Sequence, residues 1–161
     1  MDNPIIKLLI KTGIIVGITV IVCTFFIGIY PVHTNSMYPM LKDGDLVITN
    51  KLQTPSFNDV VAYETETGEL SFSRVIAASG TEVSITEGGL SLNGSPVTED
   101  IFYETKPAPS GTINYPYAVL YDNYFLLNDF RQDTRDSREF GEVNKDKLKG
   151  SVIFILRRRS F

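Results

Sequence analysis

The hydrophobic pattern divides the chain into one long apolar segment and a longer region of short alternating segments. Residues 12–30 carry no charged side chain and are rich in Ile, Val and Phe. A helix of this length measures about 28 Å at 1.5 Å per residue, close to the hydrocarbon thickness of a bilayer. Lys7 and Lys11 precede the segment, and the next basic residue is Lys42. The positive-inside rule therefore predicts a single-pass anchor with a cytoplasmic N-terminus and residues 31–161 outside the membrane.

A cleavable signal peptide is the alternative explanation of the same segment. It would have a shorter apolar region, followed by small residues in an Ala-x-Ala-like pattern. Residues 30–33 read Tyr-Pro-Val-His, which offer no such pattern. The sequence therefore favours an uncleaved anchor over residues 1–30 and an exported domain over residues 31–161.

Short apolar or alternating segments separated by turn residues fill the exported region. The candidate strands are residues 46–49, 60–63, 70–78, 82–85, 90–92, two short segments within 117–127, and 152–156. Asn93-Gly94 is a hairpin signal, and residues 98–116 have the looser composition of a loop. No long stretch of the region shows helical periodicity. We predict a mainly β fold of antiparallel, barrel-like sheets behind one transmembrane helix, with residues 80–121 as a small insert subdomain.

Composition narrows the possible functions. The net charge of −4 implies no basic face, which argues against a nucleic-acid partner. One cysteine, Cys23, and one histidine, His33, exclude an intrachain disulfide and a metal cluster built on cysteine or histidine. Cys23 lies inside the apolar segment, where it is interpreted as a packing residue. We predict neither a metal nor a cofactor.

The first candidate site follows the apolar segment. Residues 34–41 read Thr-Asn-Ser-Met-Tyr-Pro-Met-Leu, with Ser36 as a candidate nucleophile. This box resembles the S-M-x-P-T-L motif of type I signal peptidases, the membrane-anchored serine proteases that remove signal peptides from exported proteins. The Ser, Met, Pro and Leu of the motif match, while Met40 stands where Thr is usual.

A block near the end of the chain supports this resemblance. Residues 128–141 read Asn-Asp-Phe-Arg-Gln-Asp-Thr-Arg-Asp-Ser-Arg-Glu-Phe-Gly and are similar to the family's G-D-N-R-x-N-S-x-D-S-R-x-x-G. Asn128 stands where that motif has Gly, and Thr134 where it has Ser. Residues 44–47 and 58–63 resemble two further blocks in the same order. Four ordered blocks behind an apolar segment are far more specific than the serine box alone.

The strand that resembles the family's lysine-bearing strand has no lysine. A serine hydroxyl needs a neighbouring base to remove its proton, and a buried lysine can serve because burial lowers its pKa. Residues 70–76 resemble the family strand ending K-R-V-I-G, and Ser73 occupies the lysine position. Arg74 stays protonated, and His33 precedes Ser36 by three residues, so neither is an obvious substitute. We predict that the chain is catalytically inactive or nearly so.

Two explanations of Ser73 remain open at this point. It is either an engineered replacement of the lysine or the mark of a natural signal-peptidase-like protein that has lost its base. Proteins of the second kind occur beside pilus gene clusters and assist pilin assembly, so a pilin-binding assembly chaperone is the alternative function. A self-cleaving repressor-type protease resembles the same Ser-Lys core, but it carries a DNA-binding domain instead of a membrane helix.

The resemblance implies roles for the other site residues. Ser36 would attack the scissile carbonyl, and its N–H with the Thr34 hydroxyl would form the oxyanion hole. Thr134 would orient the base. The floor of the site would be held by Asp136, Ser137 and Arg138. The pocket for the first residue before the cut would be lined by Val32, His33, Met37 and Phe72.

The resemblance also implies partners and a location. The substrate would be a signal peptide of an exported preprotein, bound as an added strand with small residues at the first and third positions before the cut. Pilin precursors and membrane lipid are further expected partners, as is a second copy whose N-terminal segment enters the groove. The expected location is the bacterial cell membrane.

Overall fold

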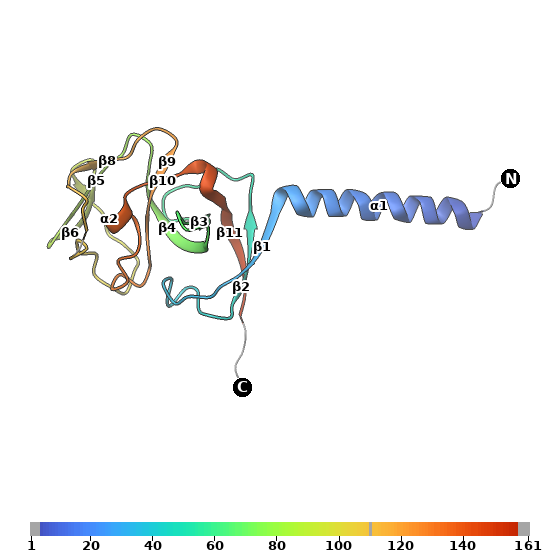
Figure 1. Ribbon diagram of the computed structural model, residues 1–161, viewed down its shortest axis with the longest axis horizontal. Helices are drawn as coiled ribbons and strands as arrows, with labels where there is room; N and C mark the ends of the chain where they lie inside the picture. Colours follow the sequence, from blue (N-terminus) through green and yellow to red (C-terminus); the bar gives the residue numbers. More distant parts are fainter. Residues whose placement is uncertain (1–3, 110, 158–161) are drawn as a thin grey trace.

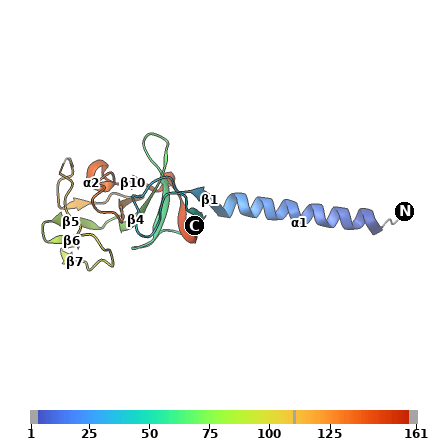
Figure 2. The same cartoon turned by 90° about the horizontal axis from the view of Figure 1, so that it is seen from below.

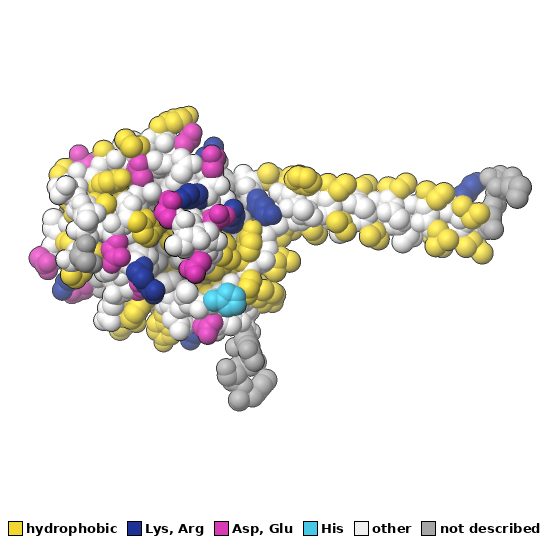
Figure 3. Space-filling model, viewed as in Figure 1, with side chains coloured by type: hydrophobic (Ala, Val, Ile, Leu, Met, Phe, Trp, Pro, Cys, Tyr) yellow, Lys and Arg dark blue, Asp and Glu magenta, His cyan; other side chains and the backbone are white. Residues whose placement is uncertain are grey.

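The computed structural model describes residues 4–109 and 111–157, so the first three residues of the predicted N-terminal segment lie outside the described part. Helix α1 (Pro4–Phe26) projects away from a β domain in both views (Figure 1, Figure 2). It buries no residue, and its length and composition suffice to cross a membrane. Its apolar side chains lead to further apolar surface where the helix joins the domain (Figure 3).

The helix ends four residues before the end of the predicted span. Residues Ile27–Pro31 form strand β1, which pairs antiparallel with β2 (Leu46–Asn50). The expectation of one helix over residues 12–30 is therefore wrong at its C-terminal end, and the helix instead reaches back to Pro4. The pairing with β2 gives the β1 backbone its hydrogen bonds. Gly28 permits the close fit, because a Cβ there would lie 2.5 Å from the Thr49 hydroxyl.

A seven-stranded antiparallel sheet forms the body of the domain. Its strand order is β1-β2-β11-β3-β4-β9-β10. The bounds of the remaining strands are β3 Val60–Glu64, β4 Leu70–Ala78, β9 Asn123–Leu127, β10 Val143–Asn144 and β11 Leu148–Leu156. The predicted mainly β, antiparallel fold is confirmed, and the bounds expected for β4 match the observed ones. The agreement comes from short apolar or alternating segments bounded by turn residues: β2 alternates in burial, whereas β3 and β9 are each buried at four successive positions.

A second, four-stranded sheet lies at the end of the domain farthest from α1 (Figure 1, Figure 2). Its order is β7-β6-β5-β8, and its strands are β5 Glu82–Thr86, β6 Gly89–Leu92, β7 Ser95–Pro96 and β8 Tyr117–Ala118. Asn93 and Gly94 form the hairpin turn between β6 and β7, as predicted, and both have positive φ. Apart from this turn and β7, the described residues from 93 to 116 lack regular structure.

Two short helical turns follow β9. Helix α2 (Ser137–Phe140) is capped by Asp136, and the 3-10 turn η1 (Lys145–Lys147) is capped by Asn144. Neither was predicted, because four or fewer residues are too few to show a helical period.

The buried residues that fix the serine box form one of three core clusters. Val32, Met37 and Leu41 from the box and its approach pack against β2, β3 and β4, and each is at most 1% exposed. A second cluster joins β4 and β9 to the four-stranded sheet, and a third joins β3, β4, β9 and β10. The serine box is thus a packed part of the sheet's core.

Gly150 marks the point where β11 passes from β3 to β2. The register of β11 against β3 is irregular between Leu148 and Gly150, and Gly150 has a φ of +114°. A Cβ at this position would lie 2.6 Å from the carbonyl oxygen of Asn50. The position therefore requires glycine for both its dihedral angle and its close contact.

We predict that Gly150→Ala lowers the free energy of unfolding by about 2–4 kcal/mol, because it adds strain and a backbone clash. Denaturant unfolding of the detergent-solubilised chain measures the loss. Gly68→Ala is the matched control, since Gly68 also has a positive φ but open space around it. It should cost only about 1–2 kcal/mol. Equal losses for the two variants would contradict a special role of the Asn50 contact.

Candidate active site

Ser36 lies in the turn between β1 and β2 and is held from two sides. Beneath it, Met37 and Leu41 are buried in the core. Across from it, the backbone N–H of Phe130 donates to the Ser36 carbonyl oxygen at 2.9 Å. The N–H of Asp129 also lies 3.4 Å from the Met37 sulfur. The serine box and the late block, about ninety residues apart in the chain, are therefore in direct contact.

Ser36 borders a cleft of about 420 Å³. Thr34 lies beside it, and the two hydroxyl oxygens are 3.0 Å apart. The other walls come from the β3–β4 hairpin and from the segment that follows β9, as far as the end of η1. They are lined by Tyr63, Glu64, Thr65, Glu66, Thr67, Glu69, Leu70, Ser71, Asn128, Asp133, Arg135, Glu139, Phe140, Glu142, Val143 and Lys147. A volume of this size is typical of ligand-binding clefts in proteins.

Ser73 lies on β4, fully buried. The Ser73 Oγ lies 2.8 Å from the Asn128 Oδ1. It also lies 2.8 Å from the backbone carbonyl oxygen of the preceding residue, Phe72. The Tyr63 hydroxyl is 3.4 Å away. Burial raises the pKa of Tyr63, and the hydrogen bond with Ser73 opposes that rise. All polar partners of the Ser73 hydroxyl in the described structure are neutral, so this position offers no base.

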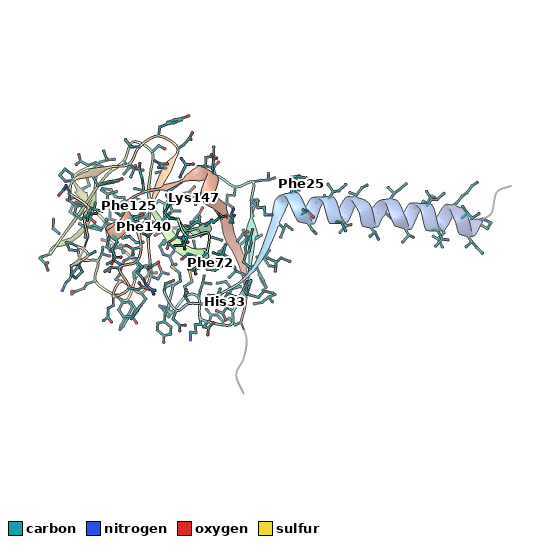
Figure 4. All side chains as sticks on the ribbon, viewed as in Figure 1. Phe25, His33, Phe72, Phe125, Phe140 and Lys147 are labelled. Carbon is teal, nitrogen blue, oxygen red and sulfur yellow. The ribbon has the colours of Figure 1, made fainter. Side chains whose placement is uncertain are left out.

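Several charged side chains of the cleft are held in ion pairs. Arg135 forms an ion pair with Asp133 at 2.8 Å. The paired carboxylate raises the pKa of Arg135, and the guanidinium lowers the pKa of Asp133. Lys147 is paired with Glu66 at the rim. His33 is exposed and lies on the opposite side of Phe72 from Lys147 in Figure 4. Among the described residues, Thr34 is the hydrogen-bond partner of the Ser36 hydroxyl.

Asp136 and Arg138, which were predicted to hold the floor of the site, form a buried ion pair. Both side chains are at most 1% exposed, and the guanidinium binds both carboxylate oxygens at 2.8–2.9 Å. Arg138 also donates to the carbonyl oxygens of Arg131 and Asp133, each at 2.8 Å. Burial raises the pKa of Asp136, whereas the bonds from Arg138 and from the Asn128 N–H lower it. Every strong donor and acceptor of the pair therefore has a partner.

The remaining predicted site residues fall into separate places. Ser137 lies next to the ion pair, where its Oγ accepts from the Leu126 N–H at 2.8 Å. Thr134 donates its hydroxyl to Glu139, so it is not directed at Ser73. The three apolar residues predicted to line the first pocket are buried in the core cluster behind the serine box: Val32, Met37 and Phe72. The fourth, His33, is exposed and is not among the residues that line the cleft.

Sequence reasoning missed two polar residues that contact Ser73. Asn128 bonds to it from the end of β9, and Tyr63 approaches it from β3. The sequence did hold one sign of the role of Asn128, because this residue stands where the family motif has Gly. Tyr63 left none, because its position depends on the register that pairs Tyr63 with Ser71 across two strands.

Comparisons with known proteins agree with this architecture. The family model for signal peptidase, peptidase S26, matches residues 5–157. The inactive signal peptidase IA of Staphylococcus aureus (strain Mu50 / ATCC 700699) is 29% identical over 159 residues, covering 93% of this chain and 90% of the relative. Signal peptidase IB of Staphylococcus aureus (strain COL) is 27% identical over 172 residues, covering 96% of this chain and 90% of the relative.

A solved structure shows the same fold. A signal peptidase I from Enterococcus faecalis V583 superposes with a TM-score of 0.53 at 24% identity, covering 63% of this chain and 98% of that chain. The match to the family model extends over almost the whole chain, from within α1 to the end of β11. The chain therefore belongs to the signal peptidase family, peptidase S26.

Proposed function

We propose that this protein is a membrane-anchored member of the signal peptidase I type that binds signal peptides of exported preproteins without cleaving them. One observation carries the proposal: Ser36 borders an open cleft, while the position of the base holds a buried serine with neutral partners. In this proposal the cleft serves as the binding surface and Ser36 as the nucleophile, while the described polar partners of Ser73 include no basic side chain. The name of the inactive signal peptidase IA relative states the loss of activity for that protein.

The missing step is the removal of the Ser36 proton. In acyl transfer, Ser36 would attack the scissile carbonyl while a lysine at position 73 accepted its proton. General-base catalysis contributes about 10²–10⁴-fold to a rate. Arg74 cannot replace the lysine, because it stays protonated and both carboxylate oxygens of Asp129 bind it at 2.6–2.7 Å. Thr34 and the Ser36 N–H would still stabilise an oxyanion, which can be worth about 3 kcal/mol.

The cleft supports binding of an extended peptide. The peptide would lie between the β3–β4 hairpin and the segment from Asp133 to Val143, with its scissile bond at Ser36. Val32, Met37 and Phe72 lie in the core behind the serine box, so a side chain that enters there meets packed atoms after a short distance. This shallow depth is the basis for proposing small residues at the first and third positions before the cut. Pilin precursors are one class of exported preprotein that the binding assay can include.

The orientation of the anchor follows from its flanking charges. Lys7 and Lys11 lie at the N-terminal end of α1, which by the positive-inside rule stays in the cytoplasm. The cleft would then face the outside of the bacterial cell membrane, where signal peptides emerge.

We predict that Ser95→Cys, made in a Cys23→Ser background, reacts with a membrane-impermeant maleimide in intact cells or spheroplasts. Ser95 is exposed on β7, and the Cys23→Ser change removes the chain's own thiol. Asp2→Cys in the same background is the control and should react only after lysis. The reverse labelling pattern would contradict the proposed orientation.

We predict that Ser71→Trp weakens binding of a fluorescent signal-peptide fragment by at least about tenfold, or 1.4 kcal/mol. Ser71 lines the cleft on β4, so a large side chain there occupies the space of the peptide. Fluorescence anisotropy with the full chain in detergent measures the affinity. Ser95→Trp, on the exposed edge of the four-stranded sheet, should bind as the unchanged chain does. Equal binding by both variants would place the peptide elsewhere.

We predict that the unchanged chain cleaves a signal-peptide precursor at least about 10²-fold more slowly than Staphylococcus aureus signal peptidase IB does. Mass spectrometry of the precursor after prolonged incubation measures the product. Ser36→Ala should leave this background rate unaltered. Cleavage by the unchanged chain that disappears in Ser36→Ala would show a working site and overturn the proposed inactivity.

A further inference from the structure

We infer that Asn128 fills the place of the missing base, so that residues 73 and 128 act as one unit and lysine at position 73 alone does not restore cleavage. The inference rests on the proposed function, because it concerns the base that this function lacks. It assigns Asn128 as the residue that determines whether position 73 can carry a catalytic amine.

The Asn128 side chain is fixed at both ends. It is 2% exposed, and its Oδ1 lies 2.8 Å from the Ser73 Oγ. Its Nδ2 donates to the carbonyl oxygens of Asp133 and Arg135, each at 3.3 Å. Its backbone N–H donates to the Asp136 carboxylate at 2.9 Å. The amide therefore cannot turn away from Ser73 without losing its hydrogen bonds to the carbonyl oxygens of Asp133 and Arg135.

The same amide contacts Ser73 and also lines the cleft that Ser36 borders. Asn128 and Ser36 both line the cleft, whereas Ser73 lies behind them with no exposed surface. A lysine side chain places its ammonium on a flexible four-carbon stem and so reaches well beyond a serine hydroxyl. At position 73 it would have to extend through the volume that Asn128 occupies, because Val61, its fully buried pairing partner on β3, closes the strand side.

Asn128 would also give such a lysine the wrong charge state. A general base must be neutral, and a hydrogen bond that the charged form makes to an acceptor favours the charged form. The Asn128 Oδ1 is an acceptor within hydrogen-bond distance of the side chain at position 73. Steric overlap and stabilisation of the ammonium therefore act in the same direction. Glycine at position 128 would remove both.

The sequence departs from the family pattern at two separate positions, 73 and 128, and the structure places these two positions in contact. Ser73 stands where the family pattern has Lys, and Asn128 stands where it has Gly. These positions are 55 residues apart in the chain and in direct contact in the fold. A single engineered replacement of the lysine does not account for the second change. The pair favours the natural loss of the base over engineering.

The test compares four full-length chains in detergent: unchanged, Ser73→Lys, Asn128→Gly, and the double variant. We expect the double variant to cleave a signal-peptide precursor at least about 10²-fold faster than Ser73→Lys. Residual cleavage by Ser73→Lys should begin at a higher pH than cleavage by the double variant, because the Asn128 oxygen stabilises the ammonium.

Thermal unfolding provides a readout that does not need catalysis. Ser73→Lys should lower the melting temperature by about 5 °C or more when Asn128 is present, and by clearly less when it is made in the Asn128→Gly background. Ser71→Lys is the matched control, since Ser71 lies two residues earlier on the same face of β4 and lines the open cleft. Asn128→Gly should not relieve any effect of that lysine.

The outcomes separate the inference from the proposed function. Cleavage by Ser73→Lys equal to that of the double variant, or additive changes in melting temperature, would overturn the inference. Coupled melting temperatures with no cleavage by the double variant would support the shared space and count against the proposed role of Ser36. Coupled melting temperatures with cleavage by the double variant alone support both.

Discussion

The buried ion pair of Asp136 and Arg138 is the constraint on which the site depends. The pair closes the loop after β9 on itself through the carbonyl oxygens of Arg131 and Asp133. This closed loop carries Phe130, whose N–H holds the Ser36 carbonyl oxygen. Removing one partner of such a pair leaves a buried charge and costs about 3–5 kcal/mol. The position of Ser36 is therefore coupled to an interaction that the fold cannot easily lose.

This coupling gives a structural reason why residues of the late block match the family pattern. Asp136, Ser137 and Arg138 all match it, which on sequence alone suggests a site still in use or recently disabled. In the structure each is buried and bonded to the backbone of β9 or of the loop after it. Substituting any of them would leave unpaired polar groups in the interior. Their presence is required by the fold whether or not Ser36 reacts.

The sequence predicted most of the strands because each is a short apolar or alternating segment bounded by turn residues. It could not predict where α1 ends, because Ile27–Pro31 is as apolar as the helix and its strand pairing is set by β2. The site was predicted residue by residue from ordered motifs, yet the contact between Ser73 and Asn128 depends on the pairing of β4 with β9. Thr134 illustrates the same limit, since its hydroxyl is engaged by Glu139, five residues later in the chain.

A serine at position 73 also avoids an energetic cost that a catalytic lysine would impose on the fold. A catalytic lysine must be held neutral near pH 7, and lowering its pKa from about 10.4 to about 8 costs about 3 kcal/mol at 1.36 kcal/mol per unit. The Ser73 hydroxyl and the Asn128 amide satisfy each other without any charge. The uncharged pair therefore avoids the cost of a desolvated amine, in the usual opposition between stability and activity. Because Asn128 also lines the cleft that Ser36 borders, the uncharged contact between positions 73 and 128 reaches the surface of that cleft.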